Sequence, residues 1–299
     1  MKRPPLQNDF QRLQHRKADS APRASVLGNL LMILFAIYFL FPILWLMFAM
    51  TKSTSQLFST SIFRPGDSLV YNVKWLAGYE DGIFLRWVIN SILYASVTAS
   101  LSVLVTTLGG YALSKYKFAL RRFMLVLNMA AMMIPQAATV IPLFLMIKKI
   151  GLLDSYAGVI LPMLAYPFGV YFMSIYIRDA MPSELIDSGR IDGAGDLTIF
   201  FRIALPLLKP GLVTLFLIAF INTWNNFFLP LVLLNDTKLY PVTLGLKFWV
   251  NNLQTASVGV PLYPLILIGA FISIFPMMIL FIALKRYITS GIAMGSVKG

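Results

Sequence analysis

Five consecutive residues in the last third of the chain form a dense polar group inside an otherwise apolar stretch. They are Asn222, Thr223, Trp224, Asn225 and Asn226. An unpaired amide in an apolar environment is costly, so these side chains need hydrogen-bond partners. Neighbouring helices can supply them. A hydroxyl-rich ligand such as a sugar, with its apolar ring face against the indole, can do so equally well, and the sequence leaves both interpretations open.

A second polar segment, residues 181–211, lies between two apolar stretches and begins like a helix. Pro182 suits the first helical position and Ser183 is a candidate cap. Glu184 and Asp187 place negative charge in the first turns, where the helix dipole favours it. We therefore expect a helix to start here.

This helix is expected to be short and to be followed by a sharp turn and a second helix. Gly193 and Gly195 are stop signals. Asp196 is expected to cap a second helix over residues 197–205, which Pro206 would end. The 181–211 loop is thus predicted to form a compact helix–turn–helix.

The elements that position these two polar groups are long apolar segments. The chain has 299 residues, of which 58% are hydrophobic and only 12% charged, whereas a soluble domain has about 25% charged residues. A bilayer requires about 20 apolar residues per spanning helix. Six segments without Asp, Glu, Lys, Arg or His meet this length: 26–50, 87–113, 123–147, 157–177, 210–234 and 263–284.

Basic residues in the connecting segments predict the orientation in the membrane. Of the 25 Lys and Arg residues, 17 lie in the two tails, the second-to-third connection and the 181–211 loop, and 8 lie in the other connections. The positive-inside rule then places both termini and this loop in the cytoplasm. The net charge of +13 is spread over membrane-flanking segments without an aromatic platform, so we expect binding to lipid and no nucleic acid.

Other classes of membrane protein fit poorly. An ion-coupled secondary transporter buries ionisable residues near the membrane midplane, and the six segments have none. An intramembrane enzyme needs a nucleophile, a base or metal ligands. The chain has no cysteine, and its one histidine, His15, lies in a basic polar stretch. It also lacks the G-x-x-x-x-G-K-[ST] phosphate loop, so energy from ATP would have to come through a partner.

Several motifs occur in order from the third apolar segment to the last residue. They are Ile134-Pro135, Ile141-Pro142-Leu143, Gly151-Leu152-Leu153-Asp154-Ser155-Tyr156, Ile160-Leu161-Pro162, Arg190-Ile191-Asp192-Gly193-Ala194 with Leu205-Pro206, Phe220 to Phe228 with Pro230-Leu231, and Gly295-Ser296-Val297-Lys298-Gly299. This ordered set resembles the carbohydrate-uptake branch of the ABC importer permeases and is similar to its smaller, maltose-type member. The 181–211 loop resembles the EAA loop, through which such permeases dock onto an ATPase.

The resemblance implies an all-α integral membrane protein of the bacterial or archaeal inner membrane. Six transmembrane helices would form a permease domain, residues 26–285, with the coupling-helix loop between helices 4 and 5. Cytoplasmic tails would occupy residues 1–25 and 286–299. The implied partners are a second homologous permease, an ATPase dimer that binds ATP and Mg, and an external solute-binding protein. This chain would hold no cofactor and would not be an enzyme.

The resemblance also assigns residues to two sites, and it implies neither catalytic nor metal-binding residues. The ATPase-docking residues would be Ser183, Glu184, Asp187, Ser188, Gly189, Arg190, Ile191, Asp192, Gly193 and Ala194. The candidates for the substrate pathway are Asn222, Trp224, Asn225 and Asn226. The substrate would be a sugar or oligosaccharide. Glycerol phosphate or a polyol is the alternative, although the spans offer a phosphate no Arg or Lys.

The sequence departs from this family at two places. Asp187-Ser188-Gly189 stands where Glu-Ala-Ala is usual, which weakens the helix by roughly 1 kcal/mol at the glycine but lets another surface approach the backbone. Asn226 replaces an acidic residue found in many relatives. Asp192-Gly193 can shape the docking knob, or it can be merely a turn closed by a local side-chain bond.

Overall fold

The computed structural model describes residues 21–255 and 262–296, and all regular structure in these ranges is helical. The chain divides into two compact units, Met1–Asn72 and Val73–Gly299. The first unit contains α2 (Ala21–Ala49) and α3 (Thr54–Ser59), and α4 (Leu69–Gly78) crosses the boundary between the units. Residues 1–20 of the expected N-terminal tail lie outside the described residues.

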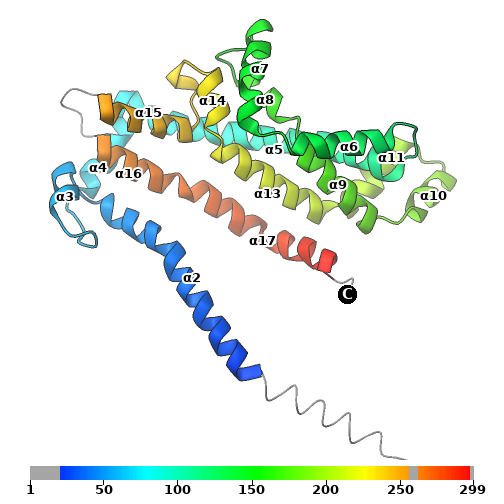
Figure 1. The fold of residues 1–299 in the computed structure, drawn as a ribbon, viewed down its shortest axis with the longest axis horizontal. Coiled ribbons are helices and arrows are strands. Elements are labelled where there is room, and N and C mark those ends of the chain that lie inside the picture. The colour runs from blue at the N-terminus through cyan, green and yellow to red at the C-terminus, as the bar shows by residue number, and fades with distance from the viewer. Residues whose placement is uncertain (1–20, 256–261, 297–299) are drawn as a thin grey trace, which may run out of the picture. The chain divides into compact units, whose positions relative to one another are not determined.

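The second unit carries the remaining helices (Figure 1). They are η1 (Tyr79–Gly82), α5 (Ile83–Lys115), α6 (Arg121–Met132), α7 (Gln136–Lys149), α8 (Tyr156–Met163), α9 (Pro167–Ala180), α10 (Glu184–Ile191), α11 (Asp196–Ile199), the π-helical η2 (Phe200–Ala204), α12 (Leu205–Leu207), α13 (Lys209–Asn225), α14 (Phe228–Leu233), η3 (Thr237–Leu239), α15 (Val242–Thr255), α16 (Leu262–Ile272) and α17 (Ile274–Ser296).

Three helical stretches of the described chain are long and apolar enough to cross a membrane: Val26–Ala49, Leu69–Lys115 and Leu262–Tyr287. The second is interrupted at Glu80 and Asp81, whose backbone is left-handed. Three further pairs are bent: α6 and α7 by 103°, α8 and α9 by 43°, and Asp196–Leu207 and Lys209–Asn225 by 79°. The described residues therefore contain three spans, or up to six if each bent pair crosses once. The expected fifth segment divides into α13 and α14, with a break at Asn226 and Phe227.

Prolines mark only some of these breaks. Pro135 is the N-cap of α7 and Pro167 is the first residue of α9, whereas Pro142 and Pro162 lie inside continuous helices. The carbonyls freed around the α8–α9 break have side-chain partners, as an apolar environment requires. Asn128 Nδ2 donates to the Pro167 carbonyl at 3.0 Å, and Ser102 Oγ donates to that of Met163 at 3.3 Å.

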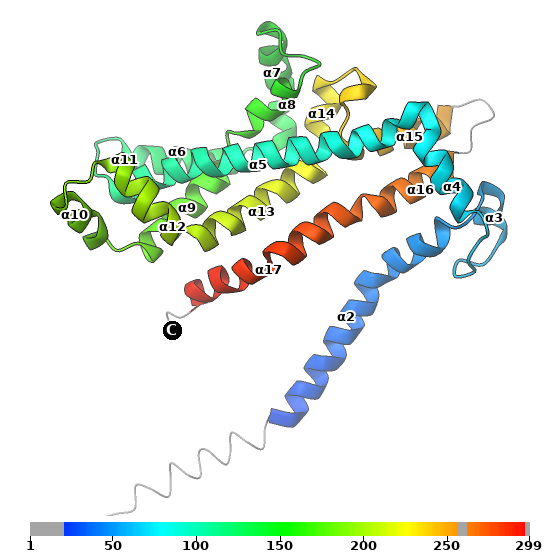
Figure 2. The same ribbon diagram turned by 180° about the vertical axis from the view of Figure 1, so that it is seen from behind.

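Helix α5 is the longest element of the second unit, and α9 and α13 pack along it (Figures 1 and 2). Small residues allow the close approach of α9. A Cβ atom added at Gly110 would lie 2.7 Å from the Cβ of Met173, and one at Gly169 would lie 2.9 Å from Cγ2 of Thr106. The buried Ser and Thr side chains of α5 therefore form a helix-packing face.

The first unit contains a folded connection between α2 and α4 that is held around a buried lysine. Lys52 Nζ donates to the Ser61 carbonyl at 2.7 Å, and Asn72 Nδ2 donates to the carbonyls of Met50 and Lys52, each at 3.0 Å. Ser53 caps α3 in a reciprocal capping box with Gln56. This connection therefore contains a capped short helix, α3.

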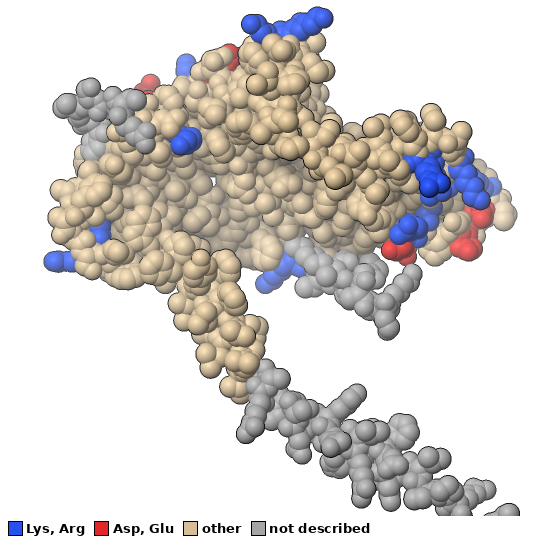
Figure 3. All heavy atoms as spheres, in the orientation of Figure 1, with Lys and Arg blue, Asp and Glu red and all other residues tan. Residues whose placement is uncertain are grey.

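Charged side chains gather at the ends of the second unit (Figure 3). In the view of Figure 1 they lie around α10 and α11 at one end and at the tip of α7, with a broad uncharged surface between them. Exposed large hydrophobic side chains are frequent on this surface, especially on α5, α6 and α17. An uncharged band flanked by charged ends is the surface that a lipid bilayer requires.

Candidate functional site

Helix α10 ends in a left-handed turn at Gly193, as the sequence predicts. Gly193 has φ = +79°, a conformation that disfavours residues with a Cβ. Its N–H donates to the Arg190 carbonyl at 3.0 Å, and the Ala194 N–H donates to the Gly189 carbonyl at 2.9 Å. These two hydrogen bonds are the pair that defines a Schellman motif. The turn therefore depends on backbone geometry at a single glycine.

Neither expected cap makes a capping hydrogen bond. Ser183 is the N-cap of α10, but its side chain makes no capping hydrogen bond. Asp196 is the first residue of α11, and its carboxylate pairs with Arg190 Nη2 at 3.0 Å. The N-cap is Gly195, so Asp196 stands one residue inside the helix and its carboxylate is taken up by the guanidinium. The Arg190 guanidinium also lies 6.0 Å from the ring centroid of Tyr116, just after α5.

The second helix of the 181–211 loop does not stop at Pro206. A π-helical turn, η2, follows α11, and helical structure continues through Pro206 to Leu207. The chain then bends by 79° into α13. Pro206 lies just after the π-helical turn, inside this continuous helical run.

Gly189 has a different role from the one inferred from its small size. A Cβ atom there would lie 3.1 Å from Cγ1 of Ile199 and 3.2 Å from Cδ1 of Ile203. The surface that approaches the backbone of α10 is thus the second helix of the same loop. Ser188 points outward and donates to the Glu184 carbonyl at 2.8 Å. Gly189 therefore makes the loop compact, whereas Ser188 stays on its outer face.

The packing of α10 and α11 leaves an apolar surface exposed. Ile186, Ile199 and Phe200 are buried in a cluster with residues of α9. Their neighbours face outward instead: Ile191 is 86% exposed and Leu197 is 71% exposed. Leu185 and Phe201 are also exposed. Large hydrophobic side chains exposed on an otherwise polar loop suit an interaction surface.

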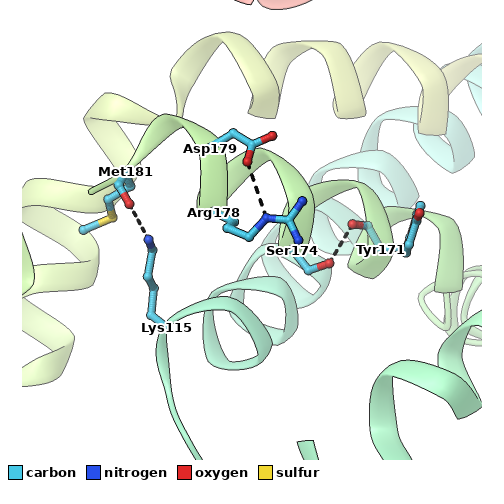
Figure 4. Close-up of polar contacts among 6 residues, drawn as sticks. All are labelled: Lys115, Tyr171, Ser174, Arg178, Asp179 and Met181. Atoms are coloured by element: carbon cyan, nitrogen blue, oxygen red, sulfur yellow. Dashed lines mark hydrogen bonds and ion pairs between the residues drawn. The ribbon is translucent and has the colours of Figure 1, made fainter. Parts of the chain in front are cut away.

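The 181–211 loop is attached to the Lys115 end of α5. Figure 4 shows Lys115 reaching the main chain of Met181, where α9 ends and the loop begins. The Lys115 ammonium donates to the Met181 carbonyl, one of the carbonyls that a helix end leaves without an internal partner. Together with the contact between Arg190 and Tyr116, this bond links the loop to α5.

A pocket of about 810 Å³ lies where three helix breaks meet. Its walls come from the α6–α7 bend, the α8–α9 bend and the end of α13 with α14. No charged residue is among those that line it: Ala131, Met132, Ile134, Gln136, Thr139, Val140, Leu143, Pro162, Met163, Ala165, Tyr166, Pro167, Phe168, Asn222, Asn225, Asn226, Phe227, Phe228 and Leu229.

The structure brings three of the four expected pathway residues together at this pocket. Asn222 Nδ2 donates to the Tyr166 hydroxyl at 3.0 Å, so it both bonds across helices and lines the pocket. Asn226 Oδ1 accepts the Leu229 N–H at 3.2 Å and holds the start of α14. Asn225 is exposed to the pocket. Trp224 is only 3% exposed and stacks on Phe220 at 6.0 Å, outside the pocket lining.

Sequence reasoning missed the aromatic residues of the pocket. Tyr166, Phe168, Phe227 and Phe228 line it, and they come from two segments about 60 residues apart in the sequence. The signal available was the proline next to Tyr166, together with the run of amides before Phe227. Neither pattern indicates that the two breaks face one another.

Comparison with known proteins defines the class. The family described as the inner membrane component of binding-protein-dependent transport systems matches residues 105–294, more than half of the chain. The chain belongs to this family, and it is therefore a transport component rather than an enzyme.

Its relatives are permease subunits of ABC importers. The arabinooligosaccharides transport permease AraQ of Halalkalibacterium halodurans is 34% identical, over 87% of this chain and 91% of the relative. The lactose transport permease LacG of Rhizobium radiobacter is 31% identical, over 87% and 91%. A crystal structure of a bacterial ABC transporter that imports alginate matches with a TM-score of 0.76 and 25% identity, over 90% of this chain and 98% of that one.

Proposed function

We propose that this permease subunit moves an uncharged sugar or oligosaccharide through the pocket lined by Asn222, Asn225 and Asn226. The observation that carries the proposal is the composition of the pocket wall, which combines amides, a tyrosine and phenylalanines without any charge. Amides pair with sugar hydroxyls, and aromatic rings cover the apolar face of a sugar ring. The volume of about 810 Å³ falls in the range of roughly 300–1,000 Å³ usual for small-molecule sites.

An anionic substrate is the alternative. One relative, the sn-glycerol-3-phosphate permease UgpE of Brucella abortus, is 28% identical over 92% of this chain. A phosphate or a carboxylate is usually bound by Arg or Lys. None of the residues lining the pocket is basic, so this chain offers no charge partner to such a group. Neutral saccharides are therefore favoured over glycerol phosphate.

The 181–211 loop is proposed to dock an ATPase subunit. The apolar patch at Leu185, Ile191, Leu197 and Phe201 would seat in a cleft of the ATPase, and the residues from Ser183 to Ala194 would form the docking knob. ATP and Mg would bind to the ATPase dimer. Its closure would move the knob, open this permease and a second homologous one outward, and let an external solute-binding protein release its sugar into the pocket. Hydrolysis would then reset the pair.

This mechanism requires both termini and the 181–211 loop to lie in the cytoplasm. A cysteine that replaces Ser188 should then react with an impermeant thiol reagent only from the cytoplasmic side, and one that replaces Ser68 only from outside. Because the natural chain has no cysteine, each variant carries a single reactive thiol. The opposite pattern would contradict the proposed orientation.

The decisive experiment is the solute dependence of ATP hydrolysis by the purified assembly. The panel should contain neutral oligosaccharides, polyols, uronic-acid oligosaccharides and glycerol phosphate. We expect stimulation by a neutral oligosaccharide and none by the anionic compounds. Stimulation by an anionic compound alone would show that the uncharged pocket is not the substrate path, and it would refute the proposal.

A further inference from the structure

Side chains of α5 hold residues 235–242, a segment that contains the short helix η3 and ends at the first residue of α15. Four consecutive carbonyls accept from α5. Trp87 Nε1 donates to Thr237 at 2.8 Å, and Arg86 Nε donates to Lys238 at 2.8 Å. The Tyr94 hydroxyl donates to the carbonyl of Leu239 at 3.1 Å. We call residues 235–242 the clamped segment.

Asn90 is the centre of this network. Its Nδ2 donates to the carbonyls of both Lys238 and Tyr240, at 2.9 and 3.0 Å, and its Oδ1 accepts from the hydroxyl of Tyr156 on α8 at 2.8 Å. Both amide hydrogens are therefore used, and the side chain is 2% exposed. One buried amide thus joins α5, α8 and the clamped segment.

Both ends of the clamped segment are fixed as well. The carboxylate of Asp154 accepts the backbone N–H groups of Asn235 and Asp236, the latter at 3.0 Å. At the other end the N–H of Val242 donates to Ser91 Oγ at 2.7 Å. The α5 residues that take part are spaced one, three or four positions apart over residues 86–94, so they lie on one face of the helix.

Helix packing reinforces these hydrogen bonds. Trp87 lies against Trp249 of α15, with ring centroids 4.7 Å apart. Gly245 leaves the space for this ring, because a Cβ atom there would lie 2.1 Å from the indole. The clamped segment and α15 are thus bound to the same turns of α5 by polar and apolar contacts.

The other end of α5 carries the 181–211 loop, through Lys115 and Tyr116. The 33 residues of α5 form one unbroken helix about 50 Å long, whereas α6–α7 and α8–α9 bend. We propose that Asn90 is a positioning residue that makes α5 and the clamped segment one rigid body, so that α5 transmits displacement of the 181–211 loop to the clamped segment. This inference rests on the proposed docking function of that loop.

The test measures rigidity and coupling separately. Spin labels on cysteines that replace Lys238 and Leu108 report the distance between the clamped segment and the body of α5. In the parent assembly this distance should be the same without nucleotide and with bound ATP. Asn90→Leu, which removes the amide without adding charge, should at least double the width of the distance distribution. Ser174→Ala removes a buried hydroxyl that bonds only to Tyr171 of its own helix, and it should leave the width unchanged.

The same variants distinguish a positioning role from a merely structural one. Asn90→Leu should lower solute-stimulated ATP hydrolysis at least fivefold while the basal rate and the binding of the ATPase stay at parental values. Parental width together with parental stimulation would overturn the inference. If Asn90→Leu does not reach the membrane, the double variant Tyr94→Phe, Tyr156→Phe takes its place, because it removes two hydroxyls of the network. The same two measurements, distribution width and solute stimulation, then test the inference. A parent assembly whose ATP hydrolysis is not stimulated by solute would instead refute the proposed function. The widths of the distance distributions would still show whether Asn90 holds the clamped segment rigidly on α5.

Discussion

Replacing Gly193 by valine tests whether the shape of the 181–211 loop matters for coupling. The residue has φ = +79°, and a Cβ atom there would meet nothing within 4 Å. A side chain there would meet no other atom of this chain, so the penalty for valine is conformational. A non-glycine residue in this region costs about 1–3 kcal/mol, and a β-branched residue lies at the upper end. Release of the turn would instead lose two hydrogen bonds of about 1 kcal/mol each.

Either route makes the docking conformation less stable by about 2–3 kcal/mol, so the affinity for the ATPase should fall roughly 30- to 150-fold. The assay is a titration of the reconstituted permease pair with the ATPase, together with the number of ATP molecules hydrolysed per solute imported. Gly193→Val should insert in the membrane normally, yet bind weakly or hydrolyse ATP without uptake.

Two controls separate backbone shape from simple bulk. Gly193→Asn adds a side chain of similar size at the same position, but asparagine tolerates positive φ, so the affinity should fall much less. Gly195→Ser places a side chain two residues further on, where φ is −71° and nothing lies within 4 Å, and should be neutral. If asparagine is as harmful as valine, the partner rejects any side chain there. Parental transport and coupling by Gly193→Val would refute the role of the loop altogether.

Three further predictions concern the pocket and the clamped segment. Asn225→Ala should raise the solute concentration needed for half-maximal ATPase stimulation without changing the melting temperature. Trp224→Ala should lower the stability by about 3 kcal/mol while the response to solute is retained. The reverse pattern would make Trp224 the residue that contacts solute and Asn225 the packing residue. Gly245→Ala should destabilise the protein by about 1–3 kcal/mol in thermal unfolding, because it displaces Trp87, while Gly28→Ala, with nothing within 4 Å, should not. Hydrogen bonds from Asn235 and Asp236 lower the pKa of Asp154 below 3.8, so its stabilising effect is complete above that pH and is lost as the pH falls through the lowered pKa. Asp154→Asn should therefore be less stable than the parent at pH 7, and the two proteins should be equally stable at a pH below the lowered pKa. A difference in stability that does not change with pH would exclude the charge of Asp154 as its cause.

The sequence predicts the apolar segments and the turn at Gly193 well, because both depend on local residue types. It does not show which prolines break a helix. Pro142 and Pro162 continue their helices, while Pro135 and Pro167 begin new ones. The outcome depends on distant groups such as Asn128, which accommodates the carbonyl of Pro167.

Long-range contacts also explain the errors at Asp196 and Gly189. A carboxylate beside a helix start normally predicts a cap, but here the folded loop brings Arg190 close enough to pair with Asp196. The clamped segment is still less accessible to sequence reasoning. Asn90 and Lys238 are 148 positions apart, and nothing near either residue indicates that an amide on α5 serves two carbonyls there.

The uncharged pocket wall has an electrical consequence. An elementary charge carried across a membrane potential of 100 mV changes in energy by about 2.3 kcal/mol. A pocket that rearranges without moving ionised side chains neither stores nor releases this energy, and an uncharged sugar adds none. If the proposed passage runs through this pocket, its opening should not depend on voltage, and a cell with a depolarised membrane should keep this step of uptake unchanged as long as ATP lasts.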